Sequence, residues 1–187
     1  MNKRSFLAAG LLAALATACT TTTGTGGDPA SRRASIDSSV DGALSKLYAQ
    51  VPDSRDLVGK ARGVLVFPSV VSAGLGVGGS YGQGSLRVGG KTDSYYSTTA
   101  ASVGLLAGAD SKAVYVLFMT QDALDKFRNS KGWTAGADAS VTMLKVGASA
   151  AVNTQTAQQP VVGYALSNAG LMANLSLDGT KVNKLDL

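Results

Sequence analysis

The chain has 187 residues, of which 17 are basic and 12 acidic, and it contains neither histidine nor glutamate. Its only cysteine is Cys19, so the usual general base, the usual zinc ligands and a spare thiol nucleophile are missing. These absences argue against an enzyme and against a metal or cofactor. The net charge of +5, which falls to +3 without residues 1–18, is too mild to argue for a nucleic-acid partner, and none is expected.

Residues 1–18 have the pattern of a secretory signal peptide. Lys3 and Arg4 precede an apolar run of 13 residues from Phe6 to Ala18. This run is shorter than the roughly 20 residues that span a bilayer. Once the signal is removed, 15 basic residues face 12 acidic ones, which leaves a net charge of +3.

The segment Ala16-Thr17-Ala18-Cys19 resembles a bacterial lipobox, in which the cysteine is acylated, for example by palmitate, and becomes the new N-terminus. It departs from that pattern at Ala16, where leucine is usual. The alternative is a secreted protein cut after Ala18 with a free thiol. We favour acylation of Cys19, because an unpaired exposed thiol is a liability in an oxidising compartment.

Residues 19–35 are predicted to form a flexible tether, because they contain almost no apolar side chains to offset the entropy of ordering. A domain over residues 36–187 then begins with helical periodicity. One apolar stripe predicts a first helix with Ser35 as its N-cap and Pro52 after its end, and comprises Ile36, Val40, Leu44, Leu47 and Val51. A second short helix is predicted through Leu57, Val58 and Ala61.

The rest of the chain reads mainly as strands. Residues 63–68 predict a buried strand, and the glycine-rich segment 74–84 predicts another. Gly74 to Gly79 match G-x-G-x-x-G, but no periodic helix follows, which argues against dinucleotide binding. The even-numbered glycines would share one strand face, which would favour close packing or, alternatively, open a groove for an acyl chain.

Further along, turns are predicted at residues 89–93, 110–112, 168–170 and 178–179, and Thr120 is predicted to cap a helix through Phe127. A hairpin is predicted over 133–152, a loop over 155–159 and strands over 161–166 and 171–177. The fold class is α+β. We expect a twisted Gly-rich antiparallel sheet, two-layered or barrel-like, with two N-terminal helices and one mid-chain helix.

Several ordered stretches resemble a bacterial SYLF-domain lipoprotein, and the resemblance covers about residues 36–187. The stretches are 60–68, the following Gly-rich strand pair, 104–109, 118–120 with 123–127, 136–140 and 167–176. The resemblance implies phospholipid binding without catalysis. It also implies an outer-membrane lipoprotein of the bacterial cell envelope that faces the periplasm or the cell surface.

In this family lipid contact is attributed to a basic N-terminal helical region. That region maps here to Lys46, Lys60 and Arg62, which are candidate headgroup-binding residues. Arg32 and Arg33 near the end of the tether are further candidates. Tyr95, Tyr96 and Trp133 are considered for an interfacial aromatic belt, with burial in the core favoured.

We therefore expect a phospholipid membrane as the partner. One alternative is a structural or protein-interaction lipoprotein that docks an envelope protein on its Gly-rich sheet. A second alternative is a hydrolase that uses Ser with Asp or Lys, which would require a serine within hydrogen-bond reach of a buried Lys or Asp.

Overall fold

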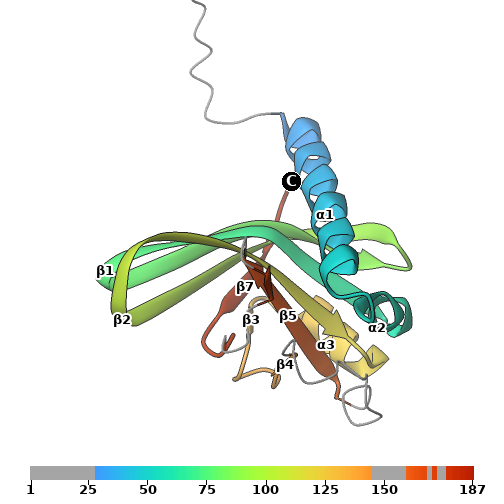
Figure 1. Cartoon of the computed structure of the whole chain (residues 1–187). Helices are drawn as coiled ribbons and strands as arrows, with labels where there is room; N and C mark the ends of the chain where they lie inside the picture. Colours follow the sequence, from blue (N-terminus) through green and yellow to red (C-terminus); the bar gives the residue numbers. More distant parts are fainter. Residues whose placement is uncertain (1–27, 145–158, 168–169, 172–175) are drawn as a thin grey trace, which may run out of the picture.

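The computed structural model describes residues 28–144, 159–167, 170–171 and 176–187 (Figure 1). Across these residues, three helices accompany a single seven-stranded sheet, which confirms the predicted α+β class. The helices are α1 (Pro29–Gln50), α2 (Ser54–Lys60) and α3 (Gln121–Asn129). The strands are β1 (Gly63–Val88), β2 (Lys91–Phe118), β3 (Trp133–Thr134), β4 (Thr142–Met143), β5 (Val161–Ser167), β6 (Gly170–Leu171) and β7 (Lys181–Leu185).

The sequence predicts a wholly antiparallel sheet, but the observed sheet is mixed. β4 runs parallel to β5, whereas the other strand pairs in the described ranges are antiparallel. The prediction failed at β4 because only a short connection forces antiparallel pairing, and the connection from Met143 to Val161 is long enough for a parallel pair. The chain from β4 to β5 instead passes through residues 145–158, which lie outside the described residues.

Helix α1 begins at Pro29, before the predicted start at Ile36, so residues 29–35 are helical rather than part of a flexible tether. Proline is well tolerated in the first turn, where its missing N–H has no intrahelical partner. Ser35 lies inside the helix and is not its cap. The predicted stripe is buried at Ile36, Val40 and Leu47, with Val51 buried just after the helix.

Strands β1 and β2 form one long ribbon joined by the turn at Gly89 and Gly90, and this ribbon folds back on itself (Figure 1). The fold lies where the ladder shifts register between Leu75 and Val77 on β1, opposite residues 103–107 on β2. Each strand therefore contributes one arm on either side of the fold. We call this fold, with its exposed apolar side chains Val71, Leu75, Val77 and Tyr81, the apolar elbow.

Glycines allow the two arms of β1 to approach closely. A β-carbon added at Gly84 would collide with the backbone oxygen of Val66, and one added at Gly82 would lie 2.8 Å from the backbone oxygen of Ser69. The close-packing interpretation of the Gly-rich strand is thus confirmed at these two positions. What approaches the glycine face is the other arm of the same strand.

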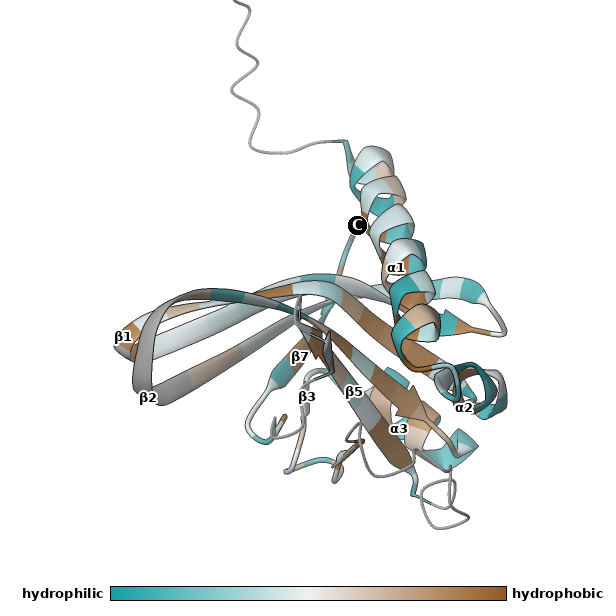
Figure 2. Ribbon diagram, in the orientation of Figure 1, coloured by the Kyte–Doolittle hydropathy of each residue, from teal (hydrophilic) through white to brown (hydrophobic). Residues whose placement is uncertain are grey.

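The core has two parts, on opposite faces of the layer that contains β5. On the outer face, α1 and α2 cover a cluster that includes Leu47, Leu57, Val66, Tyr115 and Tyr164. Figure 2 shows the hydrophobic residues of β5 and the adjoining ends of β1 and β2 beneath these helices.

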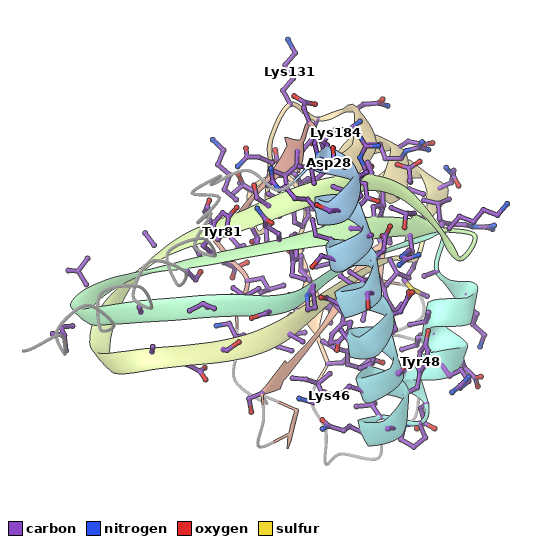
Figure 3. All side chains as sticks on the ribbon, turned by 90° about the horizontal axis from the view of Figure 1, so that it is seen from above. Asp28, Lys46, Tyr48, Tyr81, Lys131 and Lys184 are labelled. Atoms are coloured by element: carbon purple, nitrogen blue, oxygen red, sulfur yellow. The ribbon has the colours of Figure 1, made fainter. Side chains whose placement is uncertain are left out.

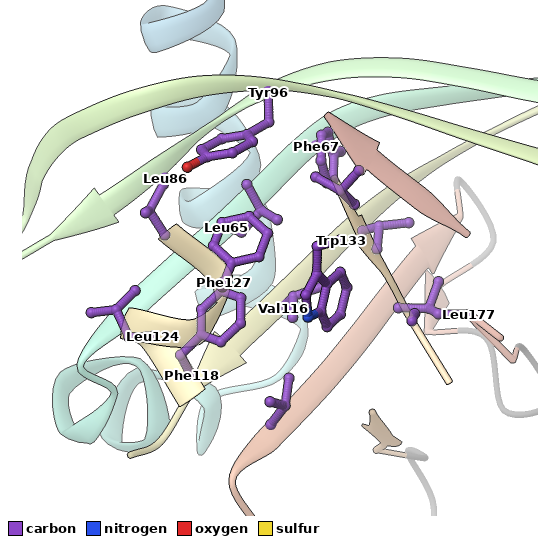
Figure 4. Packing of buried hydrophobic residues seen from close by; sticks show 14 of the residues in the cluster. Leu65, Phe67, Leu86, Tyr96, Val116, Phe118, Leu124, Phe127, Trp133 and Leu177 are labelled. Atoms are coloured by element: carbon purple, nitrogen blue, oxygen red, sulfur yellow. The ribbon is translucent and has the colours of Figure 1, made fainter. Parts of the chain in front are cut away.

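The inner cluster fills part of the curl of the sheet, next to α3. Tyr96 and Phe118 stack against Phe127 of α3 at ring-centroid distances of 4.9 and 4.7 Å, and Trp133 meets Phe127 edge-on at 5.6 Å (Figure 4). Thr120 caps α3 as predicted, because its side chain accepts a hydrogen bond from the Ala123 backbone N–H.

Further local predictions need correction, and several cannot be compared in full. Residues 110–112 do not turn, because β2 continues through them and pairs with Val70–Ser72. Asp110 and Ser111 are exposed and Lys112 is partly buried, so a strand can accommodate these polar side chains. The second correction is that the turn predicted at 89–93 is confined to Gly89 and Gly90. The two described strands of the hairpin predicted over 133–152 do not pair with each other, because β3 pairs with β7 and β4 with β5. The loop at 155–158 and parts of the predicted elements at 133–152, 168–170 and 171–177 lie outside the described residues.

Candidate functional site

The apolar elbow is the clearest unusual surface of the described part of the molecule. Its Leu75 and Val77 side chains are 83% and 69% exposed, and Val71 and Tyr81 are about half exposed. No charged residue occurs between positions 71 and 86 or between 94 and 109, the two stretches that build the fold. Soluble monomers rarely expose contiguous apolar surface of this kind without using it for an interaction.

A groove beside the elbow extends the same surface toward α1. It has a volume of about 600 Å³ and lies between the first half of α1 and the two arms of β1. Val71 and Tyr81 line it from the strand, and Ile36 lines it from the helix. Gly79 and Gly82 form part of its wall, so the Gly-rich strand both packs closely and borders an open groove.

A second hollow of about 450 Å³ lies inside the curl of the sheet, between the two arms of the ribbon. Its apolar wall includes buried residues of both arms and of β3 and β7, among them Val70, Val114, Val116, Trp133 and Val182. Polar residues line it as well, including Ser72, Ser80, Asp110, Lys112, Ser176, Asp178 and Thr180.

The structure separates Lys46 from Lys60 and Arg62. Lys60 is exposed at the last position of α2, and Arg62 is exposed just after it. Lys46 lies on α1 on the opposite side from Tyr48, which faces α2 (Figure 3). The guanidinium carbon of Arg55 lies 4.6 Å from the centroid of the Tyr48 ring, which is a cation–π contact between α2 and α1. This contact occupies the boundary between the two helices.

Lys46 instead borders a shallow depression of about 200 Å³ between α1 and β2, together with Lys112. Sequence reasoning missed Lys112, which it had assigned to a turn. Within the described ranges, neither Lys46, Lys60, Arg62 nor Lys112 forms an ion pair. Their charges are therefore available to an anionic partner.

The remaining predicted residues lie near the start of α1 or outside the residues that the structure describes. Arg32 and Arg33 lie in the first two turns of α1, and Arg33 donates a hydrogen bond to the backbone oxygen of Leu187 at the C-terminus. Cys19 lies outside the described residues. The anchor prediction therefore stays a prediction.

Another charged cluster fastens α1 to the sheet. The Asp37 carboxylate accepts hydrogen bonds from Thr92 Oγ1 at 2.7 Å and from the Tyr95 hydroxyl at 2.8 Å, and Arg87 pairs with Asp41 at 2.8 Å. Burial, and then the hydrogen bond to Asp37, raise the pKa of Tyr95. Tyr95 thus contributes to this attachment, whereas Tyr96 and Trp133 are core residues, as the sequence favoured.

Serine-based catalysis finds little geometric support among the described residues. Gly78–Gly82 match the pattern Gly-x-Ser-x-Gly, but a nucleophile elbow requires a sharp strand-to-helix turn, and Ser80 lies inside β1 opposite Ala100. Ser176 donates to the exposed Asp178 carboxylate at 2.8 Å and accepts from the Asp178 backbone N–H at 3.1 Å. This pair closes a local turn.

The described residues contain no group of three His, Cys, Asp or Glu side chains arranged to hold a metal ion. Among their helices, none combines the length and the hydropathy that crossing a bilayer requires.

These features define a small α+β domain with a curled, open sheet and an uncharged apolar surface at its fold. Residues 99–186 match the model of the Ysc84 family, described as Las17-binding protein actin regulator. This match to residues 99–186 is consistent with a SYLF-domain protein, as the resemblance indicated. No curated protein matches the chain.

The matched residues begin in β2 and run through β7, so they include one strand of the elbow and much of the inner hollow. They leave out α1, α2 and β1. All five predicted basic residues, Arg32, Arg33, Lys46, Lys60 and Arg62, lie before the match.

Proposed function

We propose that this protein is a non-enzymatic phospholipid-binding protein of the bacterial cell envelope, anchored to the outer membrane through an acylated Cys19. It would face the periplasm or the cell surface. The anchor part rests on the signal-like residues 1–18 and the lone Cys19. Incorporation of labelled palmitate, lost in C19S, tests that part.

The observation that carries the binding part is the apolar elbow. A lipid bilayer is the partner that accepts an exposed, uncharged apolar surface without requiring matched shape or hydrogen bonds. Burying Leu75 and Val77 in the acyl region would release water from two largely exposed side chains, at roughly 0.8 kcal/mol per methylene. Basic residues elsewhere on the domain would add roughly 1 kcal/mol each near an anionic surface.

Vesicle co-sedimentation tests this proposal directly. The protein is the mature chain from residue 19 with Cys19→Ser, so that no acyl chain contributes. The vesicles contain equal parts of phosphatidylethanolamine and phosphatidylglycerol, with phosphatidylcholine vesicles in a second arm. We expect the protein to sediment with vesicles at low salt, and its failure to do so in both arms would overturn the proposal.

Two sets of variants then locate the contact. Leu75→Ser with Val77→Ser should weaken binding about tenfold or more on both vesicle types, because exposed apolar area is lost. Lys60→Ala with Arg62→Ala should weaken binding to the anionic vesicles only, and added salt should mimic that loss. Lys131→Ala with Lys184→Ala is the matched control: it removes two exposed charges at the end of the molecule away from Lys46 (Figure 3).

A protein-docking role is the second candidate, because the description of the matched family names a protein partner, Las17. Crosslinking in the envelope separates the two roles. Photo-crosslinkers at positions 75 and 77 should label lipid under our proposal. Labelling of a discrete protein neighbour, together with absent vesicle binding, would instead support docking on the Gly-rich sheet.

A further inference from the structure

The hollow inside the curl of the sheet has the size of a small-ligand site. Its volume of about 450 Å³ lies within the range of roughly 300–1,000 Å³ that ligand pockets occupy. A methylene group takes about the same space as a water molecule, about 30 Å³, so the hollow corresponds to about 15 carbons of an aliphatic chain. That is one acyl chain rather than two.

The wall of the hollow is apolar where it is deepest. Val114 and Val116 point into it from β2, Trp133 and Val182 close the far side, and all four are at most 5% exposed. Figure 4 shows Trp133 beside Val116, with Phe67 and Leu177 nearby. None of these side chains offers a charged group, so the deep part suits a hydrocarbon.

Small residues leave the hollow unfilled. Ser72, Ser80, Ala100 and Ala101 line it from both strands near the elbow, where larger side chains would fill the space. Protein interiors are normally packed to the density of organic crystals, and an empty apolar cavity destabilises a fold. Small side chains around an apolar space are therefore consistent with a space that a ligand fills.

The mouth of the hollow carries charges of both signs. Lys112 lies two residues before Val114 on β2 and hence on the same strand face, and it is partly buried. Asp110 lies two residues before Lys112 on the same strand face, and Asp178 lies in the turn before β7. Both aspartates are exposed. An ammonium and two carboxylates that line the same hollow complement a head that contains both a phosphate and an amine.

We propose that this hollow binds one acyl chain of a phospholipid whose head combines a phosphate with an amine. Lys112 contacts the phosphate, Asp110 or Asp178 contacts the amine, and the chain lies against Trp133. This inference rests on the proposed phospholipid binding and goes further, because it requires a chain to leave the bilayer. The small-residue wall adjoins the elbow, so the bilayer surface and the hollow are neighbours on one ribbon.

Trp133, the only tryptophan, gives a specific readout. The mature chain with C19S is unfolded in guanidinium and refolded, to release lipid from the expression host. It is then titrated, below the critical micelle concentration, with lysophosphatidylethanolamine whose 18-carbon chain carries bromine atoms. Bromine quenches indole fluorescence on contact, and Trp133 is only 3% exposed, so a chain at the outer surface would leave it emitting.

We expect saturable quenching at one lipid per protein, and no quenching by the same lipid without bromine. Ala100→Phe should weaken the affinity about tenfold or more, because the new ring occupies the hollow. Thr99→Phe is the matched control: Thr99 is the exposed neighbour on the opposite face of β2 and does not line the hollow. Equal quenching in the two variants, or none in the unsubstituted protein, would overturn the inference.

Lys112→Gln and a monoacylglycerol with the same brominated chain test the head contact. The substitution should weaken lysophosphatidylethanolamine binding about threefold to tenfold and leave the uncharged lipid unaffected. Equal loss for both lipids would contradict the assignment of Lys112. Vesicle sedimentation without quenching removes this inference but keeps the proposed function. Quenching without sedimentation keeps the inference and removes the proposed contact of the elbow with the bilayer.

Discussion

The same two strands behave differently at the helix-covered end and at the elbow. Near α1 and α2, β1 and β2 bury Val64, Val66 and Leu117, and each is at most 5% exposed. At the fold of the ribbon, Leu75 and Val77 of β1 are mostly in solvent. Apolar residues alone thus do not define the core; the reach of the helices that cover the sheet decides which of them are buried. The uncovered ones are available for an external partner.

The largest expected effect concerns the contact that folds the ribbon. Gly84→Ala should destabilise the protein by about 3 kcal/mol, because the new methyl group collides with the Val66 backbone, which cannot rotate away as a side chain can. Gly42→Ala is the matched control: Gly42 is exposed in α1, with open space around it, and the change should stabilise by up to about 1 kcal/mol. Urea unfolding followed by circular dichroism measures both. Equal effects would mean that the two arms do not touch as described.

Replacing one leucine at the helix-covered end and one at the elbow compares the two regions directly. Leu47→Ala should cost about 3 kcal/mol, because Leu47 is fully buried between α1 and the sheet. Leu75→Ala should change stability by less than about 0.5 kcal/mol, because Leu75 is 83% exposed. Both values come from the midpoints of denaturant unfolding. A large loss at Leu75 would show that the elbow is packed against something in the free protein.

The smallest expected effect is an alkaline loss of stability that originates at the covered end. Burial raises the pKa of Tyr115 to about 12, and burial followed by the charge of Asp53 raises the pKa of Tyr164 to about 12. Unfolded tyrosine ionises near pH 10, so the contribution is complete below pH 10 and is lost as the pH rises toward 12. Unfolding free energy should fall by about 1 kcal/mol per tyrosine between pH 9 and 11.

A phenylalanine variant at the covered end tests this assignment. Tyr164→Phe should reduce the alkaline loss, measured by urea unfolding at pH 9 and pH 11. An alkaline loss of the same size in both proteins would assign it to other groups.

Much of the fold followed from local patterns. The apolar stripe that includes Val40 and Leu47 predicted α1, Thr120 predicted the start of α3, and the run at 161–166 predicted β5. These features depend on neighbours within a few residues, which the sequence displays. The start of α1 at Pro29 was missed because a helix can continue on backbone hydrogen bonds without apolar side chains.

The candidate site was less predictable. The sequence drew attention to Lys46, Lys60 and Arg62, yet Lys46 lies beside Lys112 on one side of α1, and α2 carries Lys60 on the other. Lys112 was hidden in a polar Asp-Ser-Lys triplet that is typical of turns but here continues a strand. Strand alternation in the Gly-rich segment puts Leu75, Val77 and Tyr81 on the face opposite the even-numbered glycines, but it does not indicate that this face lacks a cover.

The sequence by itself determined the α+β class, the helices, the Gly-rich ribbon and the absence of histidine and glutamate, because these depend on residue type and local spacing. Only the tertiary structure decided that β1 and β2 fold back together, which face of them stays bare, and that Lys112 and Trp133 line one hollow. The physical reason is that a bend in a two-stranded ribbon brings together residues far apart along the chain. Their burial depends on which elements reach them, and sequence spacing does not encode that.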